Sequence, residues 1–176
     1  MLLRHFRGVL DEPSVELRTA DGALGVAVQV CRDHTAEGRL AVPIEFKISA
    51  AVNDRELSEL HHRAFGSGSE QVVPWGQRLN RYSIFWVTAE DDAGLVGFVN
   101  VVGDGGVHAF ILDTVVSPER QGEGIGRTLI QVAASEARDR GCAWLHVDFE
   151  PELEEFYFEH CGFRSTQAGL LRLSNP

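Results

Sequence analysis

Apolar and polar positions over the middle of the chain follow the pattern of short β-strands. Residues 44–49, 83–90, 94–102 and 108–116 each form a strand-like run bounded by turn residues. Residues 91–93 are one such turn, because two aspartates and an alanine separate two apolar runs. The pattern predicts a series of strands joined by short connections.

Two helices are predicted between the first and second of these strands. Asn53 and Glu56 have the spacing of a capping box, which predicts a helix that runs to about Phe65. A second, shorter helix is predicted over residues 74–82, with Pro74 in its first turn.

The first 43 residues contain two further strand-like segments, 15–18 and 25–31, around a turn at Asp21 and Gly22. We interpret residues 1–43 as an N-terminal extension, a short β-hairpin packed on the domain or on a second subunit. Residues 44–176 then form the main domain. A chain of 176 residues, 44% of them apolar, is long enough for one sizeable core but short for two domains.

The strand at residues 108–116 leads through Ser117 and Pro118 into a glycine-rich loop that opens onto a helix. Small and apolar residues fall on one face of this helix, namely Gly126, Leu129, Ile130, Ala133, Ala134 and Ala137. Gly141 is placed to end it. The first N–H groups of a helix lack partners within it and carry the positive end of its dipole, so the loop is predicted to bind an anion such as a pyrophosphate.

Two familiar phosphate-binding motifs do not fit this loop. A P-loop needs Gly-Lys and then Ser or Thr at the helix start, whereas Gly126 is followed here by Arg127 and Thr128. The dinucleotide-binding motif also fails, because the glycines have G-x-G-x-G spacing and lie two-thirds of the way along the chain.

The run Gln121-Gly122-Glu123-Gly124-Ile125-Gly126 resembles the Q/R-x-x-G-x-G/A signature of the GNAT superfamily, the acyl-CoA-dependent N-acetyltransferases. The resemblance covers about residues 44–173 and includes the strand before the loop and residues 156–163 near the end. It implies an α/β (α+β) GNAT fold with a mixed central sheet of about six to seven strands. The sheet would be splayed between the fourth and fifth core strands, flanked by helices and extended by the N-terminal β segment.

The resemblance also implies acetyl-CoA as cosubstrate and indicates the residues that hold it. The strand backbone would contact the pantetheine arm, and the loop would contact the pyrophosphate. The residues concerned are Thr114, Val115, Val116, Gln121, Gly122, Glu123, Gly124, Ile125, Gly126 and Arg127. The two helices that follow the first strand would form the acceptor side, where His61, His62, Trp75 and Trp86 either touch substrate or serve as solvated and packing residues.

Acetyl transfer to an amine needs a base, and titratable residues on two strands supply candidates. His108 and Asp113 share the strand before the loop, but their odd spacing places them on one side only if the strand contains a bulge. His146 and Asp148 share a face of the next predicted strand, residues 144–149. Because unpaired buried charges are costly, we expect a mutual His–Asp pair, either at the catalytic site or as a structural pair near the strand ends.

The acid that protonates the leaving thiolate is a second question. The resemblance implies a tyrosine in the closing helix, but counting back from Gly162 and Phe163 puts Phe158 at that position, with Tyr157 one residue earlier. One residue is about 100° around a helix. Tyr157 can therefore act as the acid only if the helix is rotated or contains a π-bulge.

Charge and cysteine content narrow the partners. A net charge of −10 argues against nucleic acid, whose phosphates favour clustered Lys and Arg. No apolar run approaches the length of a membrane span and the start lacks a signal-peptide core, so we expect a cytoplasmic protein that does not bind a membrane. Cys31, Cys142 and Cys161 lack a ligand pattern, so we expect reduced thiols and no metal.

These observations together predict a GNAT-type N-acyltransferase that moves an acetyl group from acetyl-CoA to a primary amine of a small molecule or peptide by direct attack. Succinyl and propionyl groups stay open, because the loop recognises only the CoA portion. The alternative function is a non-catalytic acyl-CoA-binding sensor or interaction module. The N-terminal hairpin and the habit of the family favour a homodimer.

Overall fold

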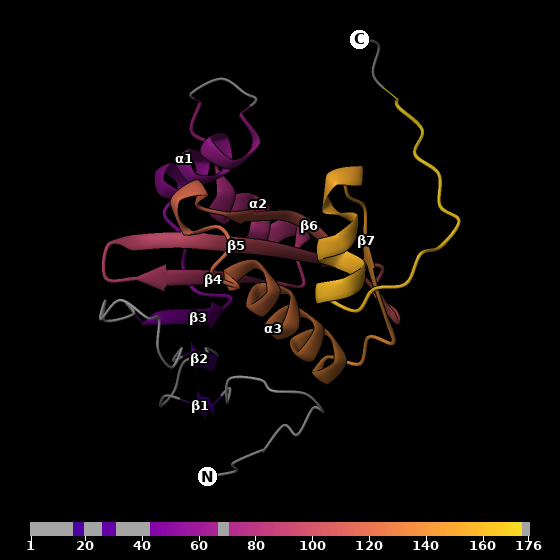
Figure 1. Cartoon of the computed structure of the whole chain (residues 1–176), viewed down its shortest axis with the longest axis horizontal. Helices are drawn as coiled ribbons and strands as arrows, with labels where there is room; N and C mark the ends of the chain where they lie inside the picture. Colours follow the sequence, from indigo (N-terminus) through magenta and orange to yellow (C-terminus); the bar gives the residue numbers. More distant parts are fainter. Residues whose placement is uncertain (1–15, 20–25, 31–42, 67–70, 174–176) are drawn as a thin grey trace.

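The computed structural model describes residues 16–19, 26–30, 43–66 and 71–173, and these form one seven-stranded mixed sheet with helices on both faces (Figure 1). The strands lie across the sheet in chain order: β1 Glu16–Thr19, β2 Val26–Val30, β3 Ile44–Ile48, β4 Phe85–Asp91, β5 Gly94–Gly103, β6 His108–Val116 and β7 Trp144–Val147. Neighbours are antiparallel except β6 and β7, which are parallel. The predicted mixed sheet is confirmed.

The two strands predicted near the N-terminus are present, and they join the main sheet. β1 pairs with β2, and β2 pairs with β3, where Val28 lies opposite Phe46. The predicted turn at Asp21 and Gly22 and the thiol of Cys31 lie outside the described residues. The hairpin therefore extends the sheet at the edge opposite β7.

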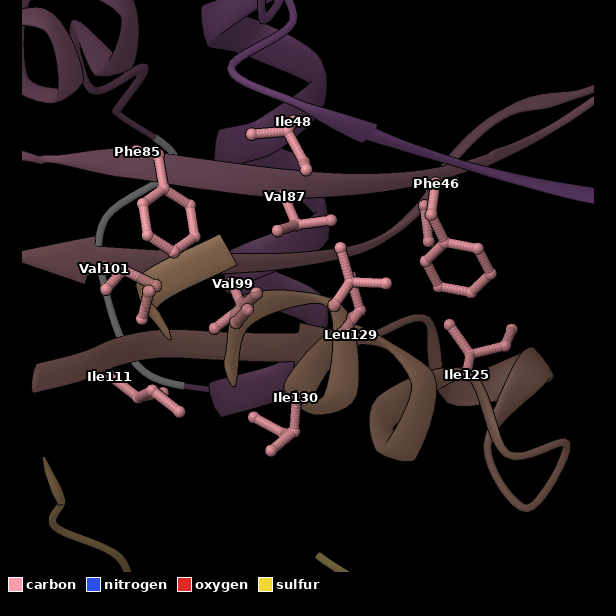
Figure 2. Close-up of a cluster of buried hydrophobic side chains, with 14 of the residues drawn as sticks. Phe46, Ile48, Phe85, Val87, Val99, Val101, Ile111, Ile125, Leu129 and Ile130 are labelled. Carbon is pink, nitrogen blue, oxygen red and sulfur yellow. The ribbon is translucent and has the colours of Figure 1, made fainter. Parts of the chain in front are cut away.

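One face of the sheet is covered by α3, Ile125–Asp139, the helix predicted after the glycine loop. Its apolar face is confirmed, with Val132 also buried and Ala134 half-buried. Gly141, with φ +90°, follows the helix and donates its N–H to Arg138. Figure 2 shows the apolar side chains of α3 and of the strands that meet here: Phe46, Ile48, Phe85, Val87, Val99, Val101, Ile111, Ile125, Leu129 and Ile130.

The other face carries α1, Asp54–Phe65, and α2, Trp75–Tyr82. A second apolar cluster joins these helices to the strands, and it consists of Leu57, Leu60, Trp75, Leu79, Trp86, Phe98 and Val115. Trp75 and Trp86 are therefore packing residues, the alternative that the sequence left open. Within the described ranges, no helix has the length and apolar character needed to cross a membrane.

The start of α1 is capped, but only half of the predicted capping box forms. The Asn53 side-chain oxygen accepts hydrogen bonds from the N–H groups of Arg55 at 3.0 Å and Glu56 at 3.2 Å. The Glu56 carboxylate does not return to Asn53. It accepts the N–H of Leu95 instead, at 2.7 Å, and so ties the start of α1 to the β4–β5 turn.

A bulge interrupts β6 opposite β5. Asn100 faces Leu112 and Phe98 faces Val115, so one residue of β5 lies opposite both Asp113 and Thr114. Asp113 takes the left-handed conformation, with φ 53°. The bulge that the spacing of His108 and Asp113 required is therefore present.

β6 and β7 separate shortly before this bulge. Their pairing runs only from His108 opposite Trp144 to Ile111 opposite Val147. Beyond Ile111, the edge of β6 on the β7 side continues without that strand as a partner. The predicted splay is confirmed, and it lies beside the glycine loop at the start of α3 (Figure 1).

We expect Asn53→Ala to lower the free energy of unfolding by about 1 kcal/mol, because two N–H groups at the start of α1 lose their acceptor. Urea unfolding would measure the change. Arg55→Ala is the matched control, since this exposed side chain lies on the same turn and should change stability by less than about 0.5 kcal/mol. Equal effects of the two changes would contradict the capping role of Asn53.

Candidate acyl-CoA and acceptor site

The glycine loop ends in an open helix N-terminus. Gly122 and Gly124 have φ values of +79° and +82°, which residues other than glycine rarely adopt. The first helical hydrogen bond runs from the N–H of Thr128 to the C=O of Gly124 at 3.0 Å, and no side chain caps this end. The N–H groups of Ile125 and Gly126 therefore point out of the helix toward the loop, as an anion site requires.

Gly126 allows close packing between the helix start and two other parts of the site. A Cβ atom here would lie 3.3 Å from Cζ of Phe156 and 3.5 Å from Cγ2 of Val116. The end of β6, the start of α3 and the closing segment thus meet at this glycine.

Arg120 holds the loop in place. Its guanidinium pairs with the buried carboxylate of Asp91 at the end of β4, and its Nε lies 3.0 Å from Oε2 of Glu123. Because Asp91 lies at the end of β4 and Glu123 lies in the loop, Arg120 links the loop to the β4–β5 turn.

The closing segment contains a π-helical turn, Phe156–His160, in which the N–H of Cys161 donates to the C=O of Phe156 at 3.0 Å. This is one of the two geometries that the sequence required before Tyr157 could reach the site. Tyr157 is 4% exposed and its ring stacks on Phe149 at 4.7 Å, whereas Phe158 is only half-buried. The π turn thus directs the tyrosine inward.

The Tyr157 hydroxyl and the Thr114 side chain lie near one another beyond the end of the β6–β7 pairing. Burial raises the pKa of Tyr157 above its ordinary value, and the nearby Thr114 hydroxyl offsets part of this shift. The Thr114 oxygen is itself buried, and among the described residues it has no hydrogen bond of normal geometry. A buried hydroxyl without a partner of normal geometry fits a site that receives a polar ligand.

Cys161 lies next to this tyrosine. Burial raises the pKa of the Cys161 thiol to about 11, and the charge of Arg127 opposes that shift. Cys161 and Cys142 are both free thiols. Because Arg127 is close enough to influence Cys161, the positive side chain at the start of α3 reaches the closing segment.

On the other face of the sheet, Asp113 is the centre of a polar cluster. Its Oδ1 lies 3.5 Å from Nε2 of His61 on α1, and its Oδ2 lies 3.2 Å from Nη2 of Arg78 on α2. Asn100 on β5 donates to Oδ2 at 3.3 Å and accepts a hydrogen bond from the Ser83 hydroxyl at 2.6 Å. Three different elements thus hold this carboxylate.

The cluster fixes the charge of Asp113. Burial is the largest influence and opposes ionisation, but His61, the charge of Arg78 and the amide of Asn100 together hold the pKa of Asp113 below its ordinary value. Asp113 is therefore a carboxylate at neutral pH and a weak proton acceptor.

The other predicted base, His108, is not part of this cluster. Nδ1 of His108 lies 2.8 Å from Nε2 of His146, and the ring of Phe110 stacks on His146 at 4.7 Å. The expectation of a mutual pair among the four predicted residues is wrong in its partners, because the two histidines pair with each other. Asp148 is exposed just beyond the end of β7.

Three residues of this cluster were not predicted from the sequence, namely Arg78, Asn100 and Ser83. Asn100 had a visible signal, since it is a single amide inside an otherwise apolar strand and is 2% exposed. Arg78 and Ser83 had none, because they lie on an unremarkable helix and the residue after it. His61 was considered as a substrate contact, but its pairing with Asp113 depends on the packing of α1 against β6.

Comparisons with known proteins agree with this geometry. The family model described as the acetyltransferase (GNAT) family matches residues 54–163. Over 82 residues the chain is 32% identical to serotonin N-acetyltransferase 2, chloroplastic, of Oryza sativa subsp. japonica. That match covers 45% of this chain and spans only 41% of the rice protein.

Two solved structures show the same fold. Glucosamine-6-phosphate N-acetyltransferase from Arabidopsis thaliana superposes with a TM-score of 0.62 at 18% identity, over 74% of this chain and 99% of that one. An aminoglycoside N-acetyltransferase in complex with CoA superposes with a TM-score of 0.61 at 15% identity, over 77% and 97%. With the family model covering more than half of its length, the chain belongs to the GNAT acetyltransferase family.

Proposed function

We propose that this protein transfers an acetyl group from acetyl-CoA to a primary amine of a small molecule or peptide by direct attack. The family uses acetyl-CoA. The observation that carries the proposal is the open N-terminus of α3, which lies beside the point where β6 leaves β7. An anion site and an adjacent unpaired strand edge suit a ligand with a pyrophosphate and an amide-containing arm.

The residues at the splay fit this ligand. Val115 packs on the α1 and α2 side and Val116 packs on the α3 side, so both side chains are used and the backbone is what remains for the pantetheine amides. We propose that Thr114, Val115 and Val116 contact the arm. The loop residues Gln121, Gly122, Glu123, Gly124, Ile125, Gly126 and Arg127 would hold the pyrophosphate.

The chemistry is a direct acyl transfer. The amine nitrogen attacks the thioester carbonyl, a C–N bond forms, and the nitrogen loses one proton to a base. The C–S bond then breaks, and its electron pair leaves on sulfur. Tyr157 is the proposed acid that donates a proton to this thiolate, because its raised pKa keeps it protonated at working pH and the π turn directs it inward.

The acceptor side is the face of the sheet that carries α1 and α2. By the alternation of β6, His108, Phe110 and Leu112 lie on this face, and Phe110 and Leu112 are about 40% exposed. We propose that the His108–His146 pair and Asp148 line the outer part of this side. Asp113 lies deeper, at the bulge. The rice relative is named for serotonin, so arylalkylamines belong among the acceptors to be tested.

Location and assembly are proposals of the same kind. We propose a cytoplasmic protein, on the composition and the reduced thiols, although the rice relative is named as chloroplastic. We also propose a homodimer, which sedimentation of the purified chain would test.

The primary experiment is isothermal titration with acetyl-CoA and with free CoA, followed by thiol release over a panel of amines that includes serotonin, polyamines and peptides. Binding together with amine-dependent thiol release supports the transferase. Binding without release from a broad panel favours the non-catalytic acyl-CoA module. Absence of binding would overturn the assignment of the loop.

Gly124→Ala should weaken acetyl-CoA binding by at least about 10-fold, because a left-handed alanine costs roughly 1–2 kcal/mol and disturbs the N–H groups that face the ligand. Gly141→Ala is the matched control. Gly141 lies after the other end of α3, has φ +90° and has open space where a Cβ would go. Both variants should lose a similar amount of unfolding free energy, but only Gly124→Ala should change the Kd for acetyl-CoA. An equal change of Kd in Gly141→Ala would attribute the effect to backbone strain and not to loss of ligand contact.

Tyr157→Phe should lower kcat for thiol release by about 100-fold and leave the Kd for CoA unchanged, because only the proton donor is removed. Because its pKa is raised above the ordinary value, Tyr157 keeps its proton up to about pH 9. The rate of the unaltered protein should therefore not fall below that pH through ionisation of Tyr157. Tyr82→Phe, at the exposed end of α2, serves as the control. Unchanged kcat in Tyr157→Phe would rule out the acid role.

A further inference from the structure

His61 is held at the acceptor side by three neighbours. Its ring centroid lies 4.5 Å from that of Phe65 and 5.3 Å from that of Trp75, while its Nε2 faces Asp113. The side chain is 28% exposed, so it is fixed in position and still reached by solvent. A preorganised, accessible imidazole is what proton transfer requires.

The contact with Asp113 determines which nitrogen of His61 carries the proton. A carboxylate only accepts hydrogen bonds, and Asp113 is ionised at neutral pH. This contact favours the neutral tautomer with its proton on Nε2, which leaves the lone pair on Nδ1. Within the described part of the chain, no group hydrogen-bonds to Nδ1.

We propose that His61 is the base of the transfer reaction, and that Asp113 is a positioning residue that orients its ring and stabilises the imidazolium. This inference rests on the proposed function and deepens it. It also replaces direct proton abstraction by Asp113 or His108. Asp113 is already committed to three donors, and His108 is bonded to His146.

The bulge in β6 places the contacts of the proposed base and of the proposed acid on neighbouring residues. Asp113 lies at its left-handed position on the α1 side, and Thr114, the next residue, faces Tyr157 from the other side. The proposed base contacts Asp113 and the proposed acid contacts Thr114, which are adjacent residues of β6. An amine could approach from the α1 side while the thiolate departs toward the closing segment.

Proton transfer by His61 balances as follows. Nδ1 takes the proton that the nitrogen loses when the C–N bond forms, and the imidazolium that results is paired with the Asp113 carboxylate. The C–S electron pair leaves on sulfur, which takes a proton from Tyr157. Water then takes the proton from His61 and returns a proton to Tyr157. The products are one N-acetylated amine and one molecule of CoA with a free thiol.

The charged groups that face the ring are few. Among the described residues, Asp113 comes from β6 and Arg78 from α2, and β5 contributes the neutral amide of Asn100. On α1 itself, His62 is exposed and Arg63 pairs with Glu119 at 3.4 Å. The Arg78 guanidinium compensates part of the charge of the Asp113 carboxylate.

The test compares the pH dependence of thiol release in the unaltered protein, His61→Gln, Asp113→Asn and His62→Gln, with an amine that supports turnover. Imidazole is the side chain that changes charge between about pH 5 and 8, so the rate of the unaltered protein should rise through that range. His61→Gln should lower kcat by about 100-fold and remove this rise. His62→Gln, the exposed neighbour, should behave as the unaltered protein.

Asp113→Asn separates positioning from direct abstraction. Asparagine tolerates the left-handed conformation, so the bulge should be retained. If Asp113 supports His61, the variant should keep measurable turnover with its rise displaced to lower pH. Loss of the rise in Asp113→Asn together with normal turnover in His61→Gln would overturn the proposal. Titration with CoA in each variant shows whether the cofactor side is intact, so failure of His61 as the base is distinguishable from failure of the transferase function.

Discussion

The bulge at Asp113 and Thr114 is the constraint on which the site depends. An unbulged β6 would keep strict alternation, and the residues on the two sides of the sheet would fall out of register with their partners. Because two residues of β6 lie opposite one of β5, Asp113 reaches the face that carries α1 and α2, and Thr114 reaches the closing segment. The pairing of β6 with β7 also ends in this region, at Ile111 opposite Val147.

Rigid packing on both faces holds this irregular segment. Val115 belongs to the apolar cluster of α1 and α2, and Val116 packs against the cluster of α3. The strand is therefore anchored immediately after the bulge by side chains that point in opposite directions. Closely packed protein cores do not deform continuously. The positions of Asp113 and Thr114 are therefore determined by the fold and not by a flexible loop.

Much of this architecture could be predicted from the sequence, because strand alternation and helix periodicity are local signals. The glycine loop and the face of α3 had such signals in residues 117–137. The splay was implied by the resemblance to the GNAT superfamily, and the bulge was a condition for placing His108 and Asp113 on one side. The polar cluster around Asp113 could not be predicted, since His61, Arg78 and Asn100 come from three elements far apart in the chain. The predicted His–Asp pair was wrong because His108 and Asp113 lie far apart along β6. His108 lies beside His146, whereas Asp113 contacts α1 and α2.

The β4–β5 turn supports both halves of the site. Arg120 ties the glycine loop to Asp91 on one side of the turn, and Glu56 ties the start of α1 to Leu95 on the other. A ligand that orders this turn removes conformational freedom that the second ligand would otherwise have to remove. By thermodynamic linkage, two ligands that each order this turn raise each other's affinity by the same factor. The β4–β5 turn would in this sense couple the two proposed substrates.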